Sequence, residues 1–438
     1  MAESLVFFCF GLVILAIFIE REVLSPSFLL SASFFIASIN LFLNRKNWLF
    51  YSNETVKLIF WSILSFELGC IIVKMFYHRK DNSDASVQDL MIQREKLYLY
   101  FAFQFIFYMA IVIFLFRTTG IKASLTNLSQ GVGGYYNGVQ SGTISGLPSI
   151  LNIVQILNVS GVYYLIYTLI CIKQNDKKIP MVLYLNILIG VFGSLLTGTK
   201  TTFFMYLIAF VVIYIFLKGK NYSRIKKIDV KSIVEMILAV FLLLISFKFL
   251  TNLQGREISN VNFIDTLSTY LGAPIKNLEI IVNAKPNVFE SFGAQTFSNT
   301  YDWLYGITGK INFHVTNMYQ YNWIFGKGLG NVYTILMPLY VDFGYFGSFF
   351  VMFILGIFCQ YIYNNAKFKR PRNKVNFRII FYSYLSFAII FSFFSNKMFE
   401  MIFSRSGIYF IIGLYFFDFF FRKLYFKKRS LENNNVIS

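Results

Sequence analysis

Three basic side chains stand where apolar runs of this 438-residue sequence end. Arg117 follows one run, Lys200 lies in the short turn between two others, and Arg256 comes soon after a further run. If these runs are membrane helices, the three cations lie at one depth, near one membrane face. Fixed positive charge can stabilise the negative charge that develops on a departing phosphate. Each cation could equally be an interfacial residue that meets lipid phosphates.

Group transfer to a hydroxyl also needs a group that takes up a proton. His314, in the segment INFHVTNMYQYNW, is a candidate because imidazole titrates near neutral pH. Glu257, Asp265 and Asp302 lie in the same long polar segment and are competing bases. The sequence does not rank these four, and His314 could equally make ordinary hydrogen bonds in a loop.

The composition indicates which elements must position these groups. Hydrophobic residues make up 56% of the chain, with 54 Phe and 29 Tyr, and the mean hydropathy is +0.58, typical of an integral membrane protein. A helix needs about 20 apolar residues to cross a membrane, so we expect an all-α polytopic fold with about eleven (±1) transmembrane helices. The expected spans are 5–19, 27–43, 56–76, 97–116, 150–172, 180–197, 201–217, 233–250, 339–363, 376–394 and 402–421.

Basic residues collect in loops that alternate along this order of spans. The clusters lie in 173–178, 218–231 and 367–374 and in the tail, so these segments are predicted to be cytoplasmic. Segments 117–149, 198–200, 251–338 and 395–401 then face outward. Arg45 and Lys46 fall on the outer side, against the rule, so either a helix is miscounted there or the rule is locally broken. The net charge of +19 is spread over loops that flank the membrane, which favours topology and anionic lipid as its explanation and argues against nucleic acid.

The chain divides into N-terminal helices (1–250), a large outward loop (251–338), C-terminal helices (339–421) and a basic cytoplasmic tail (422–438). A loop of nearly ninety residues usually has a function. Its stretch FIDTLSTYLGAPIKNLEIIVNA predicts two amphipathic helices, broken near Gly272 and Pro274, lying on the outer membrane surface. Segment 117–149 is rich in Gly, Ser, Asn and Thr, cannot build a core, and is expected to be mobile. It is either a linker or a lid that contacts sugar, with Tyr135 and Tyr136 as contacts.

The stretch NVYTILMPLYVDFGYFGSFF places polar and small residues at the start of the ninth span. Pro338 in the first turn would let a helix begin at the membrane surface, with Asp342 near its positive end. Gly344, Gly347 and Gly356 would then form a small-residue face for a second helix. We expect Asp342 and Asn331 to be structural residues near the site, with Asp342 holding loop donors or a cation such as Arg256.

Three stretches together resemble the oligosaccharide repeat-unit polymerases of bacterial surface polysaccharides, the Wzy-type or O-antigen polymerases. They are the helix hairpin LLTGTKTTFFMYLIAFVVIY, the long outer loop, and NVYTILMPLYVDFGYFGSFFVMFILG. The resemblance covers most of the chain. One departure is Lys200, where the family typically has Arg, because a point cation replaces a bidentate fork.

The resemblance implies a GT-C-like membrane glycosyltransferase fold with a cavity that opens outward from the bacterial cytoplasmic membrane. Such enzymes move a growing glycan from undecaprenyl pyrophosphate to a fresh lipid-linked repeat unit, and the product is O-antigen or capsular polysaccharide. Arg256, Lys200 and Arg117 would bind the pyrophosphate, and His314, Asp265 or Glu257 would serve the acceptor hydroxyl. The family also implies no metal or other cofactor, and a chain-length regulator of the polysaccharide co-polymerase type as partner.

Two alternatives stay open at this point. A transporter, including a flippase for the same lipid-linked units, would also be polytopic and basic. Transporters often carry internal repeats and charged residues at mid-membrane depth; no repeat is visible, but Glu67 lies within a span. A ligase that transfers finished glycan to another acceptor would share nearly all of these features.

Overall fold

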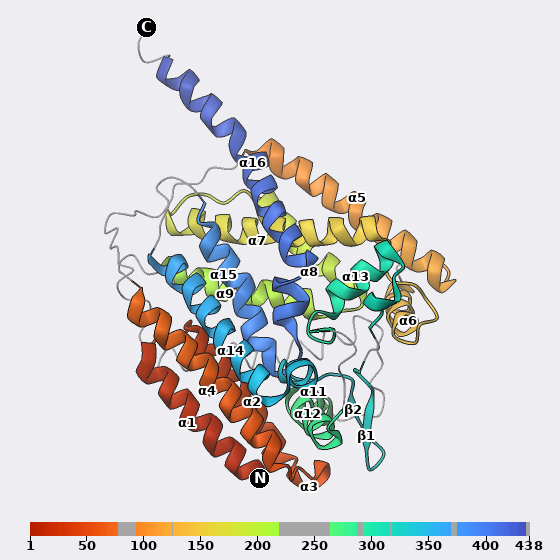
Figure 1. Cartoon of the computed structure of the whole chain (residues 1–438). Coiled ribbons are helices and arrows are strands. Elements are labelled where there is room, and N and C mark those ends of the chain that lie inside the picture. The colour runs from red at the N-terminus through yellow and green to blue at the C-terminus, as the bar shows by residue number, and fades with distance from the viewer. Residues whose placement is uncertain are drawn as a thin grey trace.

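The computed structural model describes residues 1–77, 93–124, 126–218, 263–286, 292–315, 318–368 and 375–434. These residues form a helical protein with one two-stranded antiparallel ribbon (Figure 1). The long or apolar helices are α1 Ala2–Glu20, α2 Pro26–Leu43, α4 Asn53–Phe76, α5 Arg94–Thr119, α7 Ser149–Gln174, α8 Met181–Gly193, α9 Thr201–Lys218, α14 Leu336–Phe368, α15 Phe377–Ile390 and α16 Arg405–Asn434. The shorter elements are α3 Arg45–Trp48, α6 Leu128–Gln140, η1 Ser194–Thr197, α11 Phe263–Leu271, α12 Ala273–Ala284, α13 Ser298–Thr308, η3 Ile311–Phe313, β1 Asn322–Ile324, β2 Lys327–Gly330, η4 Phe391–Phe393 and η5 Met398–Ile402.

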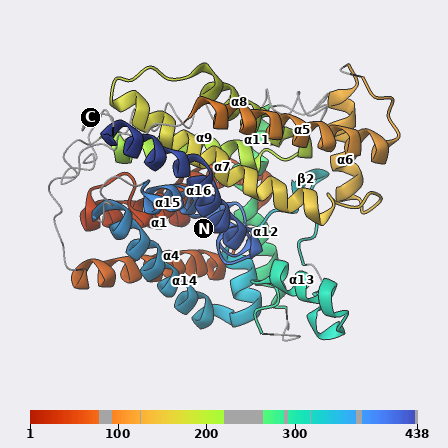
Figure 2. The ribbon, with the colours of Figure 1, turned by 90° about the horizontal axis from the view of Figure 1, so that it is seen from above.

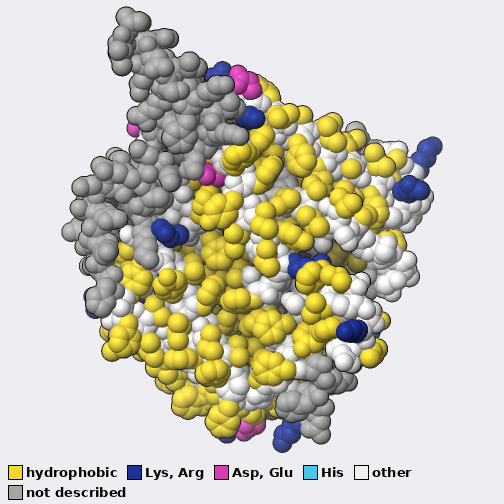
Figure 3. Space-filling model, turned by 45° about the horizontal axis from the view of Figure 1, so that its top comes forward, with side chains coloured by type: hydrophobic (Ala, Val, Ile, Leu, Met, Phe, Trp, Pro, Cys, Tyr) yellow, Lys and Arg dark blue, Asp and Glu magenta, His cyan; other side chains and the backbone are white. Residues whose placement is uncertain are grey.

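The predicted polytopic all-α membrane protein is confirmed in its main feature. Within the described residues, α1, α2, α4, α5, α7, α9 and α14 are long and apolar enough to cross a membrane, and Met181–Thr197 and Phe377–Phe393 are shorter apolar helices. Ten of the expected spans fall on helices, while the span expected at 233–250 lies outside the described residues. Figure 3 shows a face covered mainly by hydrophobic side chains with few charges, as a lipid-facing surface requires.

The helices pack in two groups, joined by α15. In the first group α4 packs on α14 and α1 on α2; in the second, α7 contacts α8 and α9, and α8 contacts α5. Figures 1 and 2 both show α1, α4 and α14 together, with α5, α7, α8 and α9 in another part of the molecule. Helix α15 contacts α9, α2 and α14, and α16 packs on α7. Two separate groups of helices therefore meet along α15.

Close contact between α4 and α14 depends on one glycine from each helix. A Cβ at Gly356 would lie 2.1 Å from the carbonyl oxygen of Phe66, and a Cβ at Gly69 would lie 2.2 Å from that of Phe353. The prediction that a small residue contacts a second helix is therefore confirmed for Gly356. It is wrong for Gly344 and Gly347. Gly344 has φ 64° and ψ −164°, which kinks α14, and the nearest neighbour of a Cβ at Gly347 is Phe343 of the same helix.

The bundle has two distinct ends. We call the end that carries α3, α6, α11 to α13 and the β1–β2 ribbon the loop end, and the opposite end, where α16 runs out to the C-terminus, the tail end (Figure 1). The Lys276 ammonium on α12 donates to the Leu49 carbonyl at 3.0 Å, which places the turn after α2 at the loop end. Arg45 and Lys46 therefore lie at the same end of the bundle as α12, as the expected order of helices requires.

The long segment forms the expected pair of helices, but one of them lies elsewhere than predicted. Helices α11 and α12 are separated at Gly272, as the sequence indicated. However, α12 packs against α2, α4, α14 and β2. Its buried residues are Ala273, Pro274, Ile275, Lys276, Asn277, Leu278, Glu279 and Val282. The prediction of a helix on the membrane surface is wrong for α12 because protein, rather than lipid, covers its apolar face.

Segment 117–149 also differs from its prediction, since it contains helix α6 with a core of its own. Tyr135 is 4% exposed and meets the Phe114 ring edge-on, with centroids 6.0 Å apart. Glycines allow this packing: a Cβ at Gly131 would lie 3.2 Å from the Phe116 ring, and one at Gly138 would lie 2.5 Å from Ile144. The prediction that this glycine-rich segment cannot build a core is therefore wrong. Glycine instead lets α6 approach α5 closely, as at Gly131.

Candidate functional site

Two of the predicted phosphate-binding cations lie at the loop end on neighbouring elements. Arg117 is in the last turn of α5, and Lys200 directly precedes α9. Helix α6 contacts both α5 and η1, the 3₁₀-helix that precedes the Lys200 turn. Gly198 in that turn has φ +74°, and a Cβ there would lie 2.7 Å from Cβ of Tyr136. Helix α6 therefore packs directly on the Lys200 turn.

Lys200 differs from an ordinary interfacial lysine in its burial. The residue is 8% exposed, whereas lysines are almost never buried unless they are paired. The described backbone of the turn is fixed by the N–H of Phe204, which donates to the Lys200 carbonyl at 3.2 Å. One turn into α9, the Phe204 ring stacks on Phe391 of η4 at 6.2 Å. Lys200 is thus held near the junction of the two helix groups.

The third predicted cation cannot be placed beside these two. Arg256 and Glu257 lie outside the described residues, and Asp265 lies in α11. Helix α11 contacts α2, α12 and β2 at the loop end. The roles of Arg256, Glu257 and Asp265 stay predictions.

His314 lies at the end of η3, next to residues of α13. It is exposed, and its ring stands edge-on to the Tyr305 ring, with centroids 5.3 Å apart. Partial burial raises the pKa of Asp302, and positive charge on His314 acts in the opposite direction. Two of the competing predicted bases, His314 and Asp302, therefore interact electrostatically.

Helix α13, which carries Asp302, is fastened to the turn between α15 and α16. The Asn299 amide donates to the Glu400 carbonyl at 3.3 Å, and the Phe297 ring meets the Phe399 ring edge-on at 5.0 Å. Further along, the Arg405 guanidinium lies 5.3 Å from the centre of the Trp303 ring, in range of a cation–π interaction. The position of the His314–Asp302 pair thus depends on the α15–α16 turn.

Asp342 holds loop donors, as predicted. Pro338 is the third residue of α14, in its first turn, and Asp342 is 6% exposed. Its carboxylate accepts from the backbone N–H of Gln295 at 3.2 Å and of Thr296 at 2.6 Å. These bonds join the segment before α13 to the start of α14.

The loop around Asn331 is held by Asn277 of α12. Asn331 is exposed, whereas the Asn277 amide donates to the carbonyls of Gly330 at 3.3 Å and of Val332 at 2.8 Å, on either side of it. The Asn322 amide completes the arrangement by donating to the Asn277 side-chain oxygen at 3.0 Å. These bonds come from the buried helix α12, and the structural role expected of Asn331 stays a prediction.

The structure also brings together an ion pair that the sequence reasoning missed. Lys397 pairs with Glu400 in the α15–α16 turn, and the Ser395 hydroxyl donates to the same carboxylate at 2.8 Å. Burial raises the pKa of Glu400, but Lys397 and Ser395 outweigh it, and the net shift is downward. Nearby Tyr319 has a raised pKa, because it is buried and because Glu400 and Asp342 are negative.

The turn that holds this pair is unusual in its backbone as well. Residues Met398–Ile402 form the π-helix η5, and π-helical turns occur frequently at functional sites. The sequence predicts an outward-facing segment at 395–401, but it assigns no role to the charges of that segment. The i,i+3 spacing of Lys397 and Glu400 between two apolar helices was the available signal.

Comparison with known proteins adds no relative. No family model matches the chain, and no curated protein or solved structure matches it.

Proposed function

We propose that this chain is a membrane glycosyltransferase that polymerises undecaprenyl-pyrophosphate-linked oligosaccharide repeat units into O-antigen or capsular polysaccharide. The reaction takes place at the outer face of the bacterial cytoplasmic membrane, which we assign to the loop end. One observation carries this proposal: Lys200 is buried at the loop end, close to the end of α5 that bears Arg117 and under a glycine-containing helix.

The reaction needs positive charge where the leaving group forms. The acceptor sugar hydroxyl attacks the anomeric carbon of the donor glycan, the bond from that carbon to the pyrophosphate oxygen breaks, and undecaprenyl pyrophosphate leaves. Lys200 and Arg117, together with Arg256, stabilise the charge that develops on the pyrophosphate. Because these cations are part of the chain, the proposed transfer requires no metal ion.

The acceptor proton passes to a base of the loop end. The His314–Asp302 pair is supported by its mutual electrostatics and by its attachment to the α15–α16 turn, while Glu257 and Asp265 stay as alternatives. The pKa of Asp302 is raised toward neutral pH, and a general base works best when its pKa lies near the working pH. The proposed partners are the lipid-linked donor and acceptor, and a chain-length regulator of the polysaccharide co-polymerase type.

A transporter of the same lipid-linked units is the second candidate, and one observation favours it. Glu67 lies within α4 and is completely buried, and ionisable residues inside a membrane commonly mark transport pathways. A flippase would move the intact unit across the membrane without lengthening its glycan. Product length and substrate position therefore separate the two functions.

Polymerisation is tested with purified protein in detergent, a lipid-pyrophosphate-linked repeat unit and no added metal, with glycan length read on a gel. The parent protein should give a ladder. Lys200→Ala and Arg256→Ala should each lower the rate by about 10²–10³-fold, as expected for loss of one charge-stabilising group. Lys200→Arg should retain most of the activity because it keeps the charge.

Lys57→Ala is the matched control. Lys57 also lies near the loop end of its helix, but its side chain is 54% exposed and pairs with the exposed Glu54. This variant should give the parent ladder. A parent protein that yields no ladder but moves the intact unit across proteoliposomes would replace the polymerase with the transporter.

A further inference from the structure

Glu67 is a carboxyl group inside the membrane that the proposed polymerisation does not use. It lies in α4, between Phe66 and Gly69, which both contact α14. Its side chain is completely buried, with an exposed fraction of 0%. Its surroundings come from α1 and α2 as well as from α4 itself. A carboxyl group at this place requires a physical explanation of its own.

The hydrogen bonds of Glu67 leave one oxygen without a partner. The Ser31 hydroxyl of α2 donates to Oε1 at 2.5 Å, whereas Oε2 has no hydrogen-bond partner in the structure. Across the residues that the structure describes, no lysine or arginine forms an ion pair with Glu67. This contrasts with Glu279, equally buried, which binds Lys276 and two backbone N–H groups.

The groups that face Glu67 do not supply positive charge. Helix α1 contributes Cys9, which interacts with Ser38 of α2. Helix α4 contributes Cys70, which also lies near Glu20 of α1 and Cys359 of α14. The basic residues Lys74 and Lys367 lie further along, beside Glu20 at the tail end. An ionised carboxylate here would be desolvated without compensation, so the neutral acid is the stable form.

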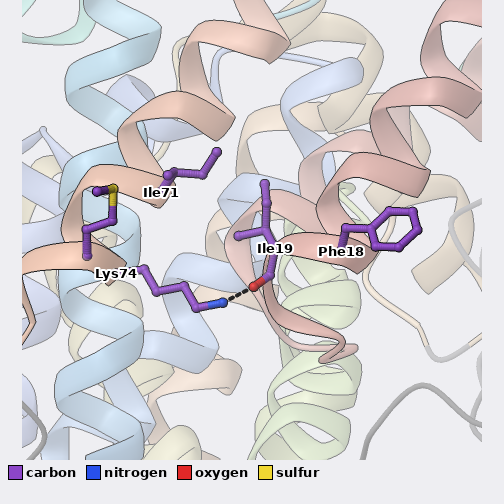
Figure 4. A pocket seen from close by; sticks show the side chains of 5 residues that line it. Phe18, Ile19, Ile71 and Lys74 are labelled. Carbon is purple, nitrogen blue, oxygen red and sulfur yellow. Dashed lines mark hydrogen bonds between the residues drawn. The ribbon is translucent and has the colours of Figure 1, made fainter.

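A surface groove begins one turn along α4 from this carboxyl, on the tail-end side. It has a volume of about 480 Å³, lies between α1 and α4, and is lined by Phe18, Ile19, Ile71, Lys74 and Met75 (Figure 4). Ile71 and Lys74 follow Glu67 by four and seven residues, so all three lie on one face of α4. Lys74 closes the lower side of the groove by donating to the Ile19 carbonyl (Figure 4).

From this geometry we infer that Glu67 is a proton-binding site within the membrane, occupied in the resting protein and exchanging with water through the groove between α1 and α4. The bound proton makes the carboxyl an O–H donor, and its release leaves a carboxylate whose one hydrogen-bond donor among the described residues is Ser31. The site is separate from the loop-end cations, so the inference stands or falls independently of the polymerase proposal. Proton binding at Glu67 would link the packing of α1, α2 and α4 to pH.

Infrared spectroscopy of the full chain in lipid nanodiscs tests this inference directly. The spectrum of the parent at neutral pH, minus that of Glu67→Gln, should contain the C=O stretch of a neutral carboxylic acid. That band should shift in ²H₂O and disappear as the pH is raised. The amide of Glu67→Gln has nearly the shape of the neutral acid, so this variant should retain the thermal midpoint of the parent.

Matched variants separate protonation from other effects. Glu279→Gln should remove no neutral-acid band, because its carboxylate is paired with Lys276. Absence of the Glu67 band at neutral pH would show an ionised group and overturn the inference. A band that neither shifts in ²H₂O nor titrates would overturn it too, because the acid would then be a sealed packing group.

Discussion

The carboxylate of Asp342 accepts a hydrogen bond from the backbone N–H of Thr296 at 2.6 Å, and its other oxygen accepts from Gln295 at 3.2 Å. The Asn396 amide holds the same residue from the opposite side, donating to the Thr296 carbonyl at 3.0 Å. Thr296 therefore connects α14 with the α15–α16 turn, directly before α13. Helix α13, which carries the candidate general base Asp302 and lies next to His314, is therefore positioned through Thr296.

Asp342→Ala should reduce both stability and activity. The change leaves the two buried N–H groups without their acceptor, at about 1–3 kcal/mol for each unsatisfied donor. Asp342→Asn keeps one acceptor oxygen and should be less damaging. Thermal unfolding in detergent measures the effect, with Asp176→Asn in an exposed tail-end turn as the control. A parent-like midpoint for Asp342→Ala would show that these bonds do not hold the loop.

Gly356→Ala and Gly69→Ala should each disturb the crossing of α4 and α14. The added methyl group would meet backbone oxygen at 2.1 Å or 2.2 Å, which a side-chain movement cannot relieve. Overpacking of this kind destabilises by about 1–3 kcal/mol, so the thermal midpoint or the yield of folded protein should fall. Gly11→Ala in α1, where a Cβ has no neighbour within 4 Å, should be neutral. Equal behaviour of all three variants would contradict the close contact.

Glu400→Gln should destabilise the protein at neutral pH but not in acid. The folded pKa of Glu400 lies below its ordinary value of 4.5, so its ionised form contributes stability above that pH. This contribution is lost as the pH falls through the folded pKa, and parent and variant should converge there. At neutral pH we expect a loss of about 1–2 kcal/mol, because the side chain of Glu400 is 25% exposed.

The exposed pair Lys57 and Glu54 provides the control for this prediction. It has the same i,i+3 spacing, but its side chains are 54% and 53% exposed. Glu54→Gln should therefore leave the stability close to that of the parent protein. Thermal midpoints over a pH series give both comparisons, and a Glu400→Gln effect that persists unchanged in acid would argue against the ion pair.

His314→Ala and Asp302→Asn should lower the turnover number if this pair takes up the acceptor proton. Loss of a general base typically reduces the rate about 10²–10⁴-fold, with a smaller change in KM. Because the pKa of Asp302 is raised, base function should fail on the acidic side at a pH above its ordinary pKa of 3.8. Asp302→Asn should remove that acidic limb from the pH–rate profile. Lys310→Ala, on the exposed residue between α13 and η3, is the control.

Much of the membrane architecture could be predicted from the sequence because its signals are local. Runs of apolar residues indicated the helices, Gly272 marked the break between α11 and α12, and Pro338 marked the start of α14. The role of Asp342 could be predicted because a carboxylate at a helix start needs donors, and the adjacent loop offered them.

The sequence-based predictions that were wrong or incomplete concern contacts between distant segments. The amphipathic pattern of α12 predicts that one apolar face is covered. Either protein or lipid can cover such a face, so the pattern does not distinguish them. Glycines in α6 suggested mobility alone, although a glycine also allows the closest approach of a neighbouring ring, as at Gly131. Lys397 and Glu400 were overlooked because each has the sequence pattern of an ordinary charge in a short turn. Their pairing and partial burial, which distinguish them, are visible in the structure alone.

The most direct test of the central claim uses proteoliposomes in which the protein has one known orientation. The lipid-linked repeat unit is supplied first on the loop-end side and then on the tail-end side, without added metal, and both glycan length and the membrane side of the product are measured. Our account predicts long glycan only when the substrate is on the loop-end side, and its loss in Lys200→Ala with recovery in Lys200→Arg. Intact repeat units that cross the membrane without lengthening would contradict it.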